Sequence, residues 1–476
     1  MKKSLKIIIP LVVVALLLPF IVVGVIAFGL PPQYDKTFLG ELSDKYDRLN
    51  ALDEPKIVVI GGSSVAFGID SAMIEEYTGM PVVNFGLYAS LGTKAMIDLS
   101  KSNINKGDIV LIAPEMDAQT LSLYFNEDSM WQAMDGHAKM LPHLGTANWG
   151  AMFGGVWNFC VNKYSFWKNN NAPDPAGIYN HSSFNEYGDI IYPREYNIMA
   201  LGYDPTTIIT LDPSIVSSDF LAYVNKYIAY CEKKGASVYF SFSPMDRMAL
   251  AEGTTAQSIY NFYSYLAAYL DCEIITDIND CIMDWEYFYD TNFHLNDAGV
   301  TVHTASLIGD LRRAMANTAT FTIELPNKPQ RPDIYVDASL NDTTGFFRFD
   351  TVDGVMTLVG ITDLGREQTS LTLPLASEGY AVQTVGARAF DGCDKLEEIV
   401  IEANTNLSLL ANNAFEGAPN LKKIIIRCLP DDILVGGGLM DGASPDVKIY
   451  VPREYYGDYA AHYFWSEFMS IITISG

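Results

Sequence analysis

Two short polar segments of the chain carry the side-chain types that nucleophilic catalysis requires. The first, Gly61-Gly62-Ser63-Ser64, directly follows the apolar run Lys56–Ile60. A serine in the turn between a buried strand and a helix presents its hydroxyl beside backbone N–H groups that can stabilise an oxyanion. We therefore predict that Ser64 is a nucleophile. The alternative is a structural turn in which Ser63 or Ser64 only caps the next helix.

The second segment, Tyr289–Gly299, contains a histidine immediately before an apolar-periodic helix. His294 with Asp290 just upstream fits a general base that an acidic partner holds in position. The chain has only six histidines, so an imidazole here is not a consequence of abundance. The alternative is a packing or capping histidine, with Asn296 or Asp297 beginning the helix.

The strands that must position these segments have the pattern of a buried parallel sheet, with continuous apolar, β-branched runs. The predicted strands are Lys56–Ile60, Val82–Phe85, Ile109–Ile112, Ser237–Phe242 and Glu273–Ile275. Helical patterns lie between them at Asp70–Thr78, Leu91–Lys101, Ser218–Lys234 and Ala256–Leu270. This alternation predicts an α/β fold whose chemistry lies at the carboxyl ends of the strands.

Both segments resemble motifs of the SGNH (GDSL-type) hydrolase superfamily. Gly62–Gly68 is similar to the first block of that family, Gly-Asp-Ser with a glycine four residues later, and Ser63 replaces the aspartate. Phe288–Gly299 is similar to the last block, in which His294 would be the base. The resemblance covers about residues 55–315 and implies a three-layer, flavodoxin-like domain with a mostly parallel sheet.

The same resemblance implies an oxyanion hole beside the nucleophile. Val83–Gly92 is similar to the second block, so the backbone N–H groups of Gly86 and Ser64 would bind the oxyanion. The third block of the family supplies an asparagine, but the matching strand end, Ala113–Asp117, places Glu115 there. A carboxylate repels an oxyanion unless it is protonated. Losing one oxyanion donor costs about 10²–10³ in rate.

A second departure concerns the carboxylate that would orient the histidine. Three residues separate Asp290 from His294, where the family usually has two. Asp290 remains the predicted orienting group. The loose pattern is closest to anchored relatives that handle acyl groups of cell-wall or exopolysaccharide chains, including the D-alanyl transfer proteins of teichoic acid and the alginate acetylation proteins. This implies an O-acylated surface glycan as substrate, with no cofactor and no metal.

The N-terminus predicts a membrane anchor over residues 1–33. Lys2, Lys3 and Lys6 precede an uncharged run, Ile7–Leu30. A helix that crosses a bilayer needs about 20 apolar residues, and the lysines would stay on the cytoplasmic side. The alternative is a cleaved signal peptide, whose apolar stretch is usually about 7–15 residues. Either alternative predicts that the rest of the chain is extracellular, single-pass at the cell membrane or secreted.

The pattern changes after the predicted hydrolase-like domain, 34–318. A proline-rich linker is predicted over 319–345. In the last predicted domain, 346–476, the phrase Ala389-Phe390-Asp391-Gly392 recurs as Ala414-Phe415-Glu416-Gly417, at an offset of 25 residues. Such a period is typical of a solenoid. The segment resembles the BspA-like leucine-rich repeats of bacterial surface proteins.

The segment Leu121–Asp212 fits neither pattern and is predicted to be an elaborated insertion over the sheet. It holds four of the six tryptophans: Trp131, Trp149, Trp157 and Trp167. These rings would either pack the insertion onto the domain or stack on sugar rings.

Composition excludes several classes of function. The 31 basic and 57 acidic residues give a net charge of −26, which argues against nucleic-acid partners. The six cysteines form no C-x-x-C pair, which argues against a zinc ribbon or a dense disulfide framework. Free buried thiols are expected, with a Cys272–Cys281 bridge as the alternative.

Two functions remain open from the sequence. The first is a serine esterase or acyltransferase that acts on an O-acylated cell-surface glycan, with the membrane as its other contact through the N-terminal helix. The second is a catalytically degraded scaffold whose repeats bind a protein or polysaccharide at the cell surface. Glu115 at the oxyanion position is the feature that favours the second function.

Overall fold

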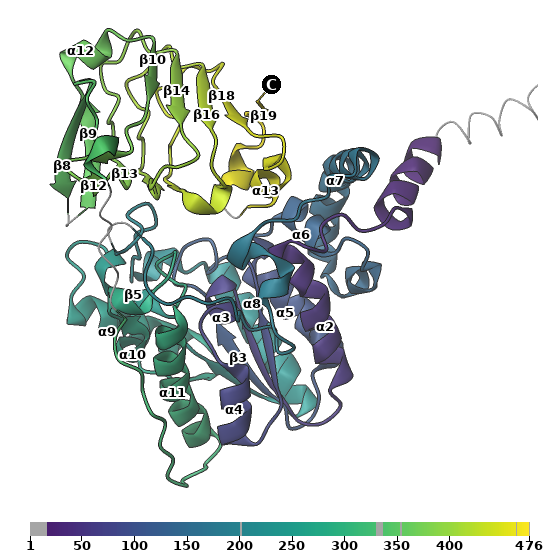
Figure 1. Cartoon of the computed structure of the whole chain (residues 1–476). Coiled ribbons are helices and arrows are strands. Elements are labelled where there is room, and N and C mark those ends of the chain that lie inside the picture. Colours follow the sequence, from purple (N-terminus) through teal and green to yellow (C-terminus); the bar gives the residue numbers. More distant parts are fainter. Residues whose placement is uncertain (1–16, 200–201, 330–336, 353–354, 463, 476) are drawn as a thin grey trace, which may run out of the picture.

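The computed structural model describes residues 17–199, 202–329, 337–352, 355–462 and 464–475. The fold is mixed α/β, and most strand pairs are parallel, as predicted. The first part of the chain forms a sheet between helices, and the part after the linker forms a stack of short strands above it (Figure 1).

The five strands of the first sheet are all parallel and follow the order β2-β1-β3-β4-β6. Their bounds are β1 Ile57–Gly61, β2 Val82–Gly86, β3 Ile109–Ala113, β4 Ser237–Phe240 and β6 Glu273–Ile274. Each corresponds to a strand predicted from the sequence. Because β2 and β3 flank β1 on opposite sides, the strand order reverses at β1. Ligand crevices of such sheets lie at the carboxyl ends of the strands at that point.

Side chains alternate along β1 and divide the core into two layers. Val58 and Ile60 pack with α2, α5 and α8 on one face, whereas Ile57 and Val59 pack with α4 and α11 on the other. The bounds of the helices are α2 Leu42–Ala51, α3 Ser63–Ala66, α4 Ser71–Thr78, α5 Thr93–Ser100, α8 Ser218–Lys234, α9 Ala256–Tyr269, α10 Ile278–Cys281 and α11 Asp297–Ala314.

Polar caps and glycines set the ends of these helices. The side chains of Asp70, Ser217 and Asn296 accept backbone N–H bonds at the starts of α4, α8 and α11. Gly79 and Gly235 end α4 and α8 in the left-handed region, at φ of 73° and 85°. Asn296 therefore begins the helix that follows His294, as one alternative predicted, and this leaves the histidine in the preceding loop.

The insertion contains two helices that the sequence pattern did not indicate, α6 Glu127–Ala133 and α7 Trp149–Asn169. A further helix over residues 17–29 lies against α7. The ammonium group of Lys163 joins them, because it donates to Ala27 O at 2.9 Å and to Asp135 Oδ1 at 2.6 Å.

The predicted membrane span Ile7–Leu30 falls partly outside the described residues, which begin at Leu17. Within the described ranges, no helix combines the length and the apolar character that crossing a membrane requires.

The part after the linker has two sheets that share one core, ordered β10-β14-β16-β18-β19 and β17-β15-β13-β9-β8. Ile399, Ile424 and Ile449 stand opposite one another in the first, so the strands pair at the 25-residue spacing of the sequence repeat. The bounds are β8 Phe347–Val352, β9 Val355–Ile361, β10 Ser370–Thr372, β13 Thr384–Val385, β14 Glu398–Ile401, β15 Leu409–Leu410, β16 Lys423–Ile426, β17 Leu434–Val435, β18 Lys448–Val451 and β19 Ile472–Ile474.

The remaining elements are short. They are the pairs β5 Met245–Asp246 with β7 Ile282–Met283 and β11 Ala376–Ser377 with β12 Tyr380–Ala381, and the helices α12 Asp363–Arg366 and α13 Tyr456–Ala461. All six cysteines are free, and five of them are buried, so the alternative bridge between Cys272 and Cys281 does not form.

Candidate active site

Three side chains at the carboxyl ends of the strands form a continuous hydrogen-bonded chain. Asp290 Oδ1 lies 2.8 Å from His294 Nδ1. On the other side of the ring, His294 Nε2 lies 2.8 Å from Ser63 Oγ. This is the order carboxylate, imidazole, hydroxyl that a serine nucleophile with its general base requires.

The serine that contacts His294 is Ser63, and this corrects the pairing with Ser64 that the sequence predicted. Ser64 Oγ is buried and has no hydrogen-bond partner within the described part of the chain. The two serines begin α3, and consecutive side chains of a helix point about 100° apart. Their order in the sequence cannot tell which of them faces the histidine.

The four-residue spacing of Asp290 and His294 does not prevent their contact. Thr291 Oγ1 accepts the backbone N–H of His294 at 3.1 Å, which tightens the loop between them. Tyr289 N also donates to His294 O at 2.9 Å. Both side chains are buried. The tightened loop brings the Asp290 carboxylate to the His294 ring within a single turn.

Two aromatic residues hold Asp290 and His294 in position, and neither was predicted from the sequence. Tyr179 donates its hydroxyl to Asp290 Oδ2 at 2.5 Å. Phe67 stacks on the imidazole of His294, with 3.8 Å between ring centres and 9° between ring planes. Phe67 lies inside the predicted first block, but Tyr179 comes from the insertion, where no motif marked it.

Glu115 lies at the position where the third block predicted it, next to the reactive serine. Its Oε1 atom is 3.0 Å from Ser63 Oγ and accepts the backbone N–H of Ser64 at 2.9 Å. A substrate carbonyl oxygen would need the same two neighbours. In this structure the glutamate carboxyl therefore occupies the oxyanion position.

The protonation state of the Glu115 carboxyl is linked to the direction of the hydrogen bond that Ser63 donates. Ser63 has one hydroxyl proton but lies between His294 Nε2 and Glu115 Oε1. If Ser63 donates to Glu115, His294 must be doubly protonated and cannot act as a base. If Ser63 donates to His294, Glu115 must be protonated. Burial raises the pKa of Glu115 and the charge of Asp117 raises it further, whereas the hydrogen bonds from Ser64 and Ser63 and the charge of His294 lower it. The net shift is upward, which is the direction that the second arrangement requires.

The predicted oxyanion donor Gly86 has another partner. Its N–H donates to the side-chain oxygen of Asn84 at 3.2 Å. A Cβ at this position would lie 2.4 Å from Val65 Cβ and 2.7 Å from Gly62 O, so the glycine permits close packing of β2 on α3. In this structure Gly86 therefore serves the packing of β2 on α3, and its N–H is bound to Asn84.

Two segments of the second part of the chain, Pro430–Leu434 and Tyr456–His462, lie beside the Tyr179–Asp290 side of the site, and we call them the roof. Pro430–Leu434 and His462 line a small cavity of about 30 Å³ together with Tyr179 and Asp290. The rings of Tyr179 and His462 lie 5.5 Å apart. Leu434 packs against a buried apolar cluster of the first part: Met199, Met283, Phe288, Leu295 and Val300. The side chains of Ser63, His294 and Asp290 are all buried, so the site is closed to solvent.

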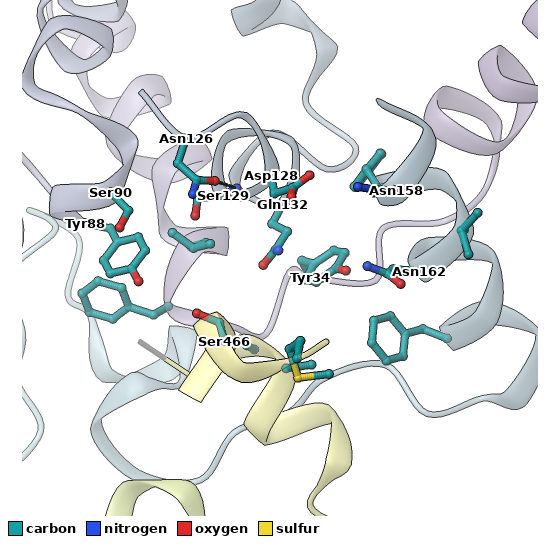
Figure 2. Close-up of a pocket in the computed structure, with 18 of the residues that line it drawn as sticks. Tyr34, Tyr88, Ser90, Asn126, Asp128, Ser129, Gln132, Asn158, Asn162 and Ser466 are labelled. Carbon is teal, nitrogen blue, oxygen red and sulfur yellow. Dashed lines mark hydrogen bonds between the residues drawn. The ribbon is translucent and has the colours of Figure 1, made fainter. Parts of the chain in front are cut away.

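A larger cavity of about 730 Å³ lies beside the roof, between α6, α7 and the C-terminal segment (Figure 2). Tyr179 is part of its wall, so the cavity reaches the side chain that holds Asp290. Among the described lining residues, Asp128 alone carries a charge. The neutral polar groups include Tyr34, Tyr88, Ser90, Asn126, Ser129, Gln132, Asn158, Asn162 and Ser466.

One cluster in the described ranges has the spacing of metal ligands, although no metal was predicted. Glu41, Asp44 and His181 place their ligand atoms within 4.8 Å of one another. A hydrogen bond to Glu41 raises the pKa of His181 to about 9. A cationic imidazole between two carboxylates accounts for the geometry as an ion pair.

Comparisons with known proteins found almost no similarity. No protein-family model matches the chain, and no curated protein matches it. One similar solved structure is that of the T. pallidum leucine-rich-repeat protein TpLRR, at 17% identity and a TM-score of 0.17. It covers 25% of this chain and 72% of that chain. A TM-score this low gives no information about the fold or the function of the chain.

Proposed function

We propose that the chain is a serine acyl-transfer enzyme, an esterase or acyltransferase, with Ser63 in the role predicted for Ser64. The hydrogen-bonded chain Asp290–His294–Ser63 carries this proposal. Ser63 Oγ attacks an ester carbonyl and gives its proton to His294 Nε2. The bond to the leaving alcohol then breaks, and the alcohol oxygen takes that proton. Asp290 holds the Nδ1–H and stabilises the imidazolium.

The acyl group on Ser63 then passes to water or to a sugar hydroxyl. The attacking hydroxyl loses its proton to His294, and Ser63 Oγ takes that proton back when the acyl–oxygen bond breaks, which regenerates both the serine and the base. The proposed fold family is SGNH-type for residues 34–318, with a BspA-like leucine-rich-repeat solenoid after the linker. We place the protein outside the cytoplasm, held to the cell membrane by its N-terminal segment.

We further propose that the larger cavity binds the glycan that carries the acyl group. Amide and hydroxyl groups beside aromatic rings suit the hydroxyl pattern and apolar faces of a neutral sugar chain. The near absence of charge there suits a neutral glycan better than a polyanion. Tyr179 lines the cavity and donates to Asp290, so a bound chain would lie beside the side chain that holds the orienting carboxylate.

Removing single amides from the cavity is expected to weaken glycan binding. Gln132→Ala and Asn158→Ala each remove one hydrogen-bonding group, worth about 1 kcal/mol or about fivefold in KM for an O-acetylated polysaccharide. Hydrolysis of p-nitrophenyl acetate, which does not need the cavity, should be unchanged. Asn169→Ala is the matched control, because this amide is exposed on α7 and does not line the cavity. An unchanged KM in both cavity variants would remove the cavity from the substrate path.

The second candidate is a scaffold without catalysis, whose C-terminal repeats bind a partner at the cell surface. Two observations favour it: Glu115 occupies the oxyanion position, and the reactive side chains are buried beside the roof. The two candidates make different predictions once the roof is displaced, since an enzyme gains access to substrate and a scaffold gains nothing.

Leu434→Glu is expected to loosen the roof, because it places a charge against the apolar cluster on which Leu434 packs. An open state that is populated at about 10% or less in the native chain would then predominate, so p-nitrophenyl acetate hydrolysis should rise about tenfold. Leu364→Glu is the control, since Leu364 is exposed on α12 of the same domain. If Leu434→Glu releases the roof from the first part of the chain and no hydrolysis appears, the scaffold is correct.

A further inference from the structure

Helix α7 has an exposed apolar face that runs along its whole length. Its members recur at helical spacing, three or four residues apart, and each is between 43% and 73% exposed: Trp149, Phe153, Trp157, Val161, Tyr164 and Trp167. Three of the four tryptophans predicted either to pack the insertion or to stack on sugars lie here, and the fourth, Trp131, is buried. A continuous exposed face of this kind marks an interaction surface.

The other faces of α7 are already used. Phe159, Cys160 and Phe166 are buried in the core. Asn158 and Asn162 point into the larger cavity (Figure 2). The apolar face is thus a third stripe, with no other element of the described chain over most of its area.

The charge of α7 differs from that of the rest of the protein. None of its 21 residues is acidic, although the chain has 57 acidic residues and a net charge of −26. Its two cationic residues are Lys163, which is buried, and Lys168 in the last turn. The face therefore avoids the negative charge that would oppose contact with lipid headgroups.

The helix over residues 17–29 continues this apolar surface. Cys160 Sγ donates to Val23 O at 3.5 Å, and Lys163 binds Ala27 O, so the two helices lie side by side. This helix also exposes large apolar side chains: Leu17, Leu18, Phe20, Ile21, Val22, Val25 and Phe28. Before it, the sequence continues with the uncharged residues Ile7–Leu16.

We propose that the apolar face of α7 lies in the interfacial layer of a lipid bilayer, beside the point where the N-terminal segment enters it. Tryptophan and tyrosine rings favour this layer because they join an apolar body to a polar tip. A helix of 21 residues is about 31 Å long at about 1.5 Å per residue, and lies in the plane of the membrane. The inference rests on the proposed membrane location, and it fixes how the enzyme stands on that membrane.

This orientation has a consequence for the substrate. Trp157 and Val161 lie on the apolar face and also line the larger cavity. One rim of the cavity would therefore meet the bilayer at the depth of the headgroups. The glycan that reaches it would be one held close to the membrane surface.

The test uses the full-length chain reconstituted in phosphatidylcholine vesicles with brominated acyl chains. Brominated lipid quenches nearby tryptophan, so we expect about half of the fluorescence to be quenched, because three of the six tryptophans lie on the face. The triple variant W149F/W157F/W167F should lose this quenching and keep flotation with the vesicles. Trp285→Phe is the control, since Trp285 lies in the first part of the chain, away from α7, and its replacement should leave lipid quenching unchanged.

Each other outcome overturns the inference in a recognisable way. Flotation with no lipid quenching, and with α7 open to acrylamide, would leave the anchor intact and reject the bilayer contact of α7. Two chains per nanodisc that separate into single chains on Phe153→Glu would assign the face to a second copy. Failure to float would reject the membrane location itself, whereas the esterase measurements on Ser63 would be unaffected.

Discussion

Ser63→Ala is expected to lower kcat/KM for p-nitrophenyl acetate by roughly 10⁴-fold or more, because the nucleophile and its general base act as a unit. Ser64→Ala is the matched control in the neighbouring residue. The Ser64 hydroxyl makes no hydrogen bond, and the substitution keeps the backbone N–H. We expect it to retain activity within about tenfold. Both variants should unfold at the temperature of the wild-type chain.

A covalent label would give the same answer without turnover. A fluorophosphonate should attach to the peptide that contains both serines, and fragmentation by mass spectrometry should place it on Ser63. Attachment to Ser64, or loss of activity in Ser64→Ala alone, would restore the pairing first predicted from the sequence. No label on either serine after the roof is displaced would reject the enzyme.

Substitution of Glu115 has the second largest expected effect and separates two roles for that carboxyl. If protonated Glu115 supplies an oxyanion donor, Glu115→Ala should lower kcat by about 10²–10³ and Glu115→Gln, which keeps a neutral donor, should retain most of it. If the carboxyl instead blocks the oxyanion position, Glu115→Ala should raise kcat. The steady-state rates of the two variants, measured side by side, distinguish these roles.

The pH profile gives an independent readout. Burial and Asp117 raise the pKa of Glu115 above its ordinary value of 4.5, so the protonated form persists to higher pH in the folded chain and is lost as pH rises through the raised pKa. We expect the wild-type rate to fall on the alkaline side for that reason. In Glu115→Gln this alkaline fall should disappear. An alkaline limb that persists in Glu115→Gln would assign it to another group.

The strands, the serine segment and the histidine segment of the site were predictable from the sequence because they depend on local patterns. β1 and β3 are continuous apolar runs, and such runs become central parallel strands wherever both faces of a sheet are covered. The residues at the carboxyl ends of neighbouring parallel strands then lie at the same edge of the sheet, whichever segments connect the strands. Glu115, just after β3, could therefore be placed beside the serine turn after β1, whereas the contact of His294 with that turn rested on the family resemblance alone.

The rest of the site depends on directions and on distant segments. Ser63 and Ser64 differ in the direction of their side chains, which the fold sets and composition does not. Tyr179 reaches Asp290 from the insertion, at a position that no motif marked. The roof depends on how the repeats dock onto the first part of the chain, through contacts such as that of Leu434, and no motif encodes docking.

The roof also orders events during synthesis. The reactive residues lie before Asp297, whereas the roof, which lines the cavity at Asp290, begins at Pro430. Chains are made from the N-terminus, and domains fold as units when they emerge. A nascent chain therefore completes its Ser–His–Asp arrangement before the roof has been synthesised. We expect a chain stalled before Pro430 to react with a fluorophosphonate faster than the finished protein, so that closure is the last step of its maturation.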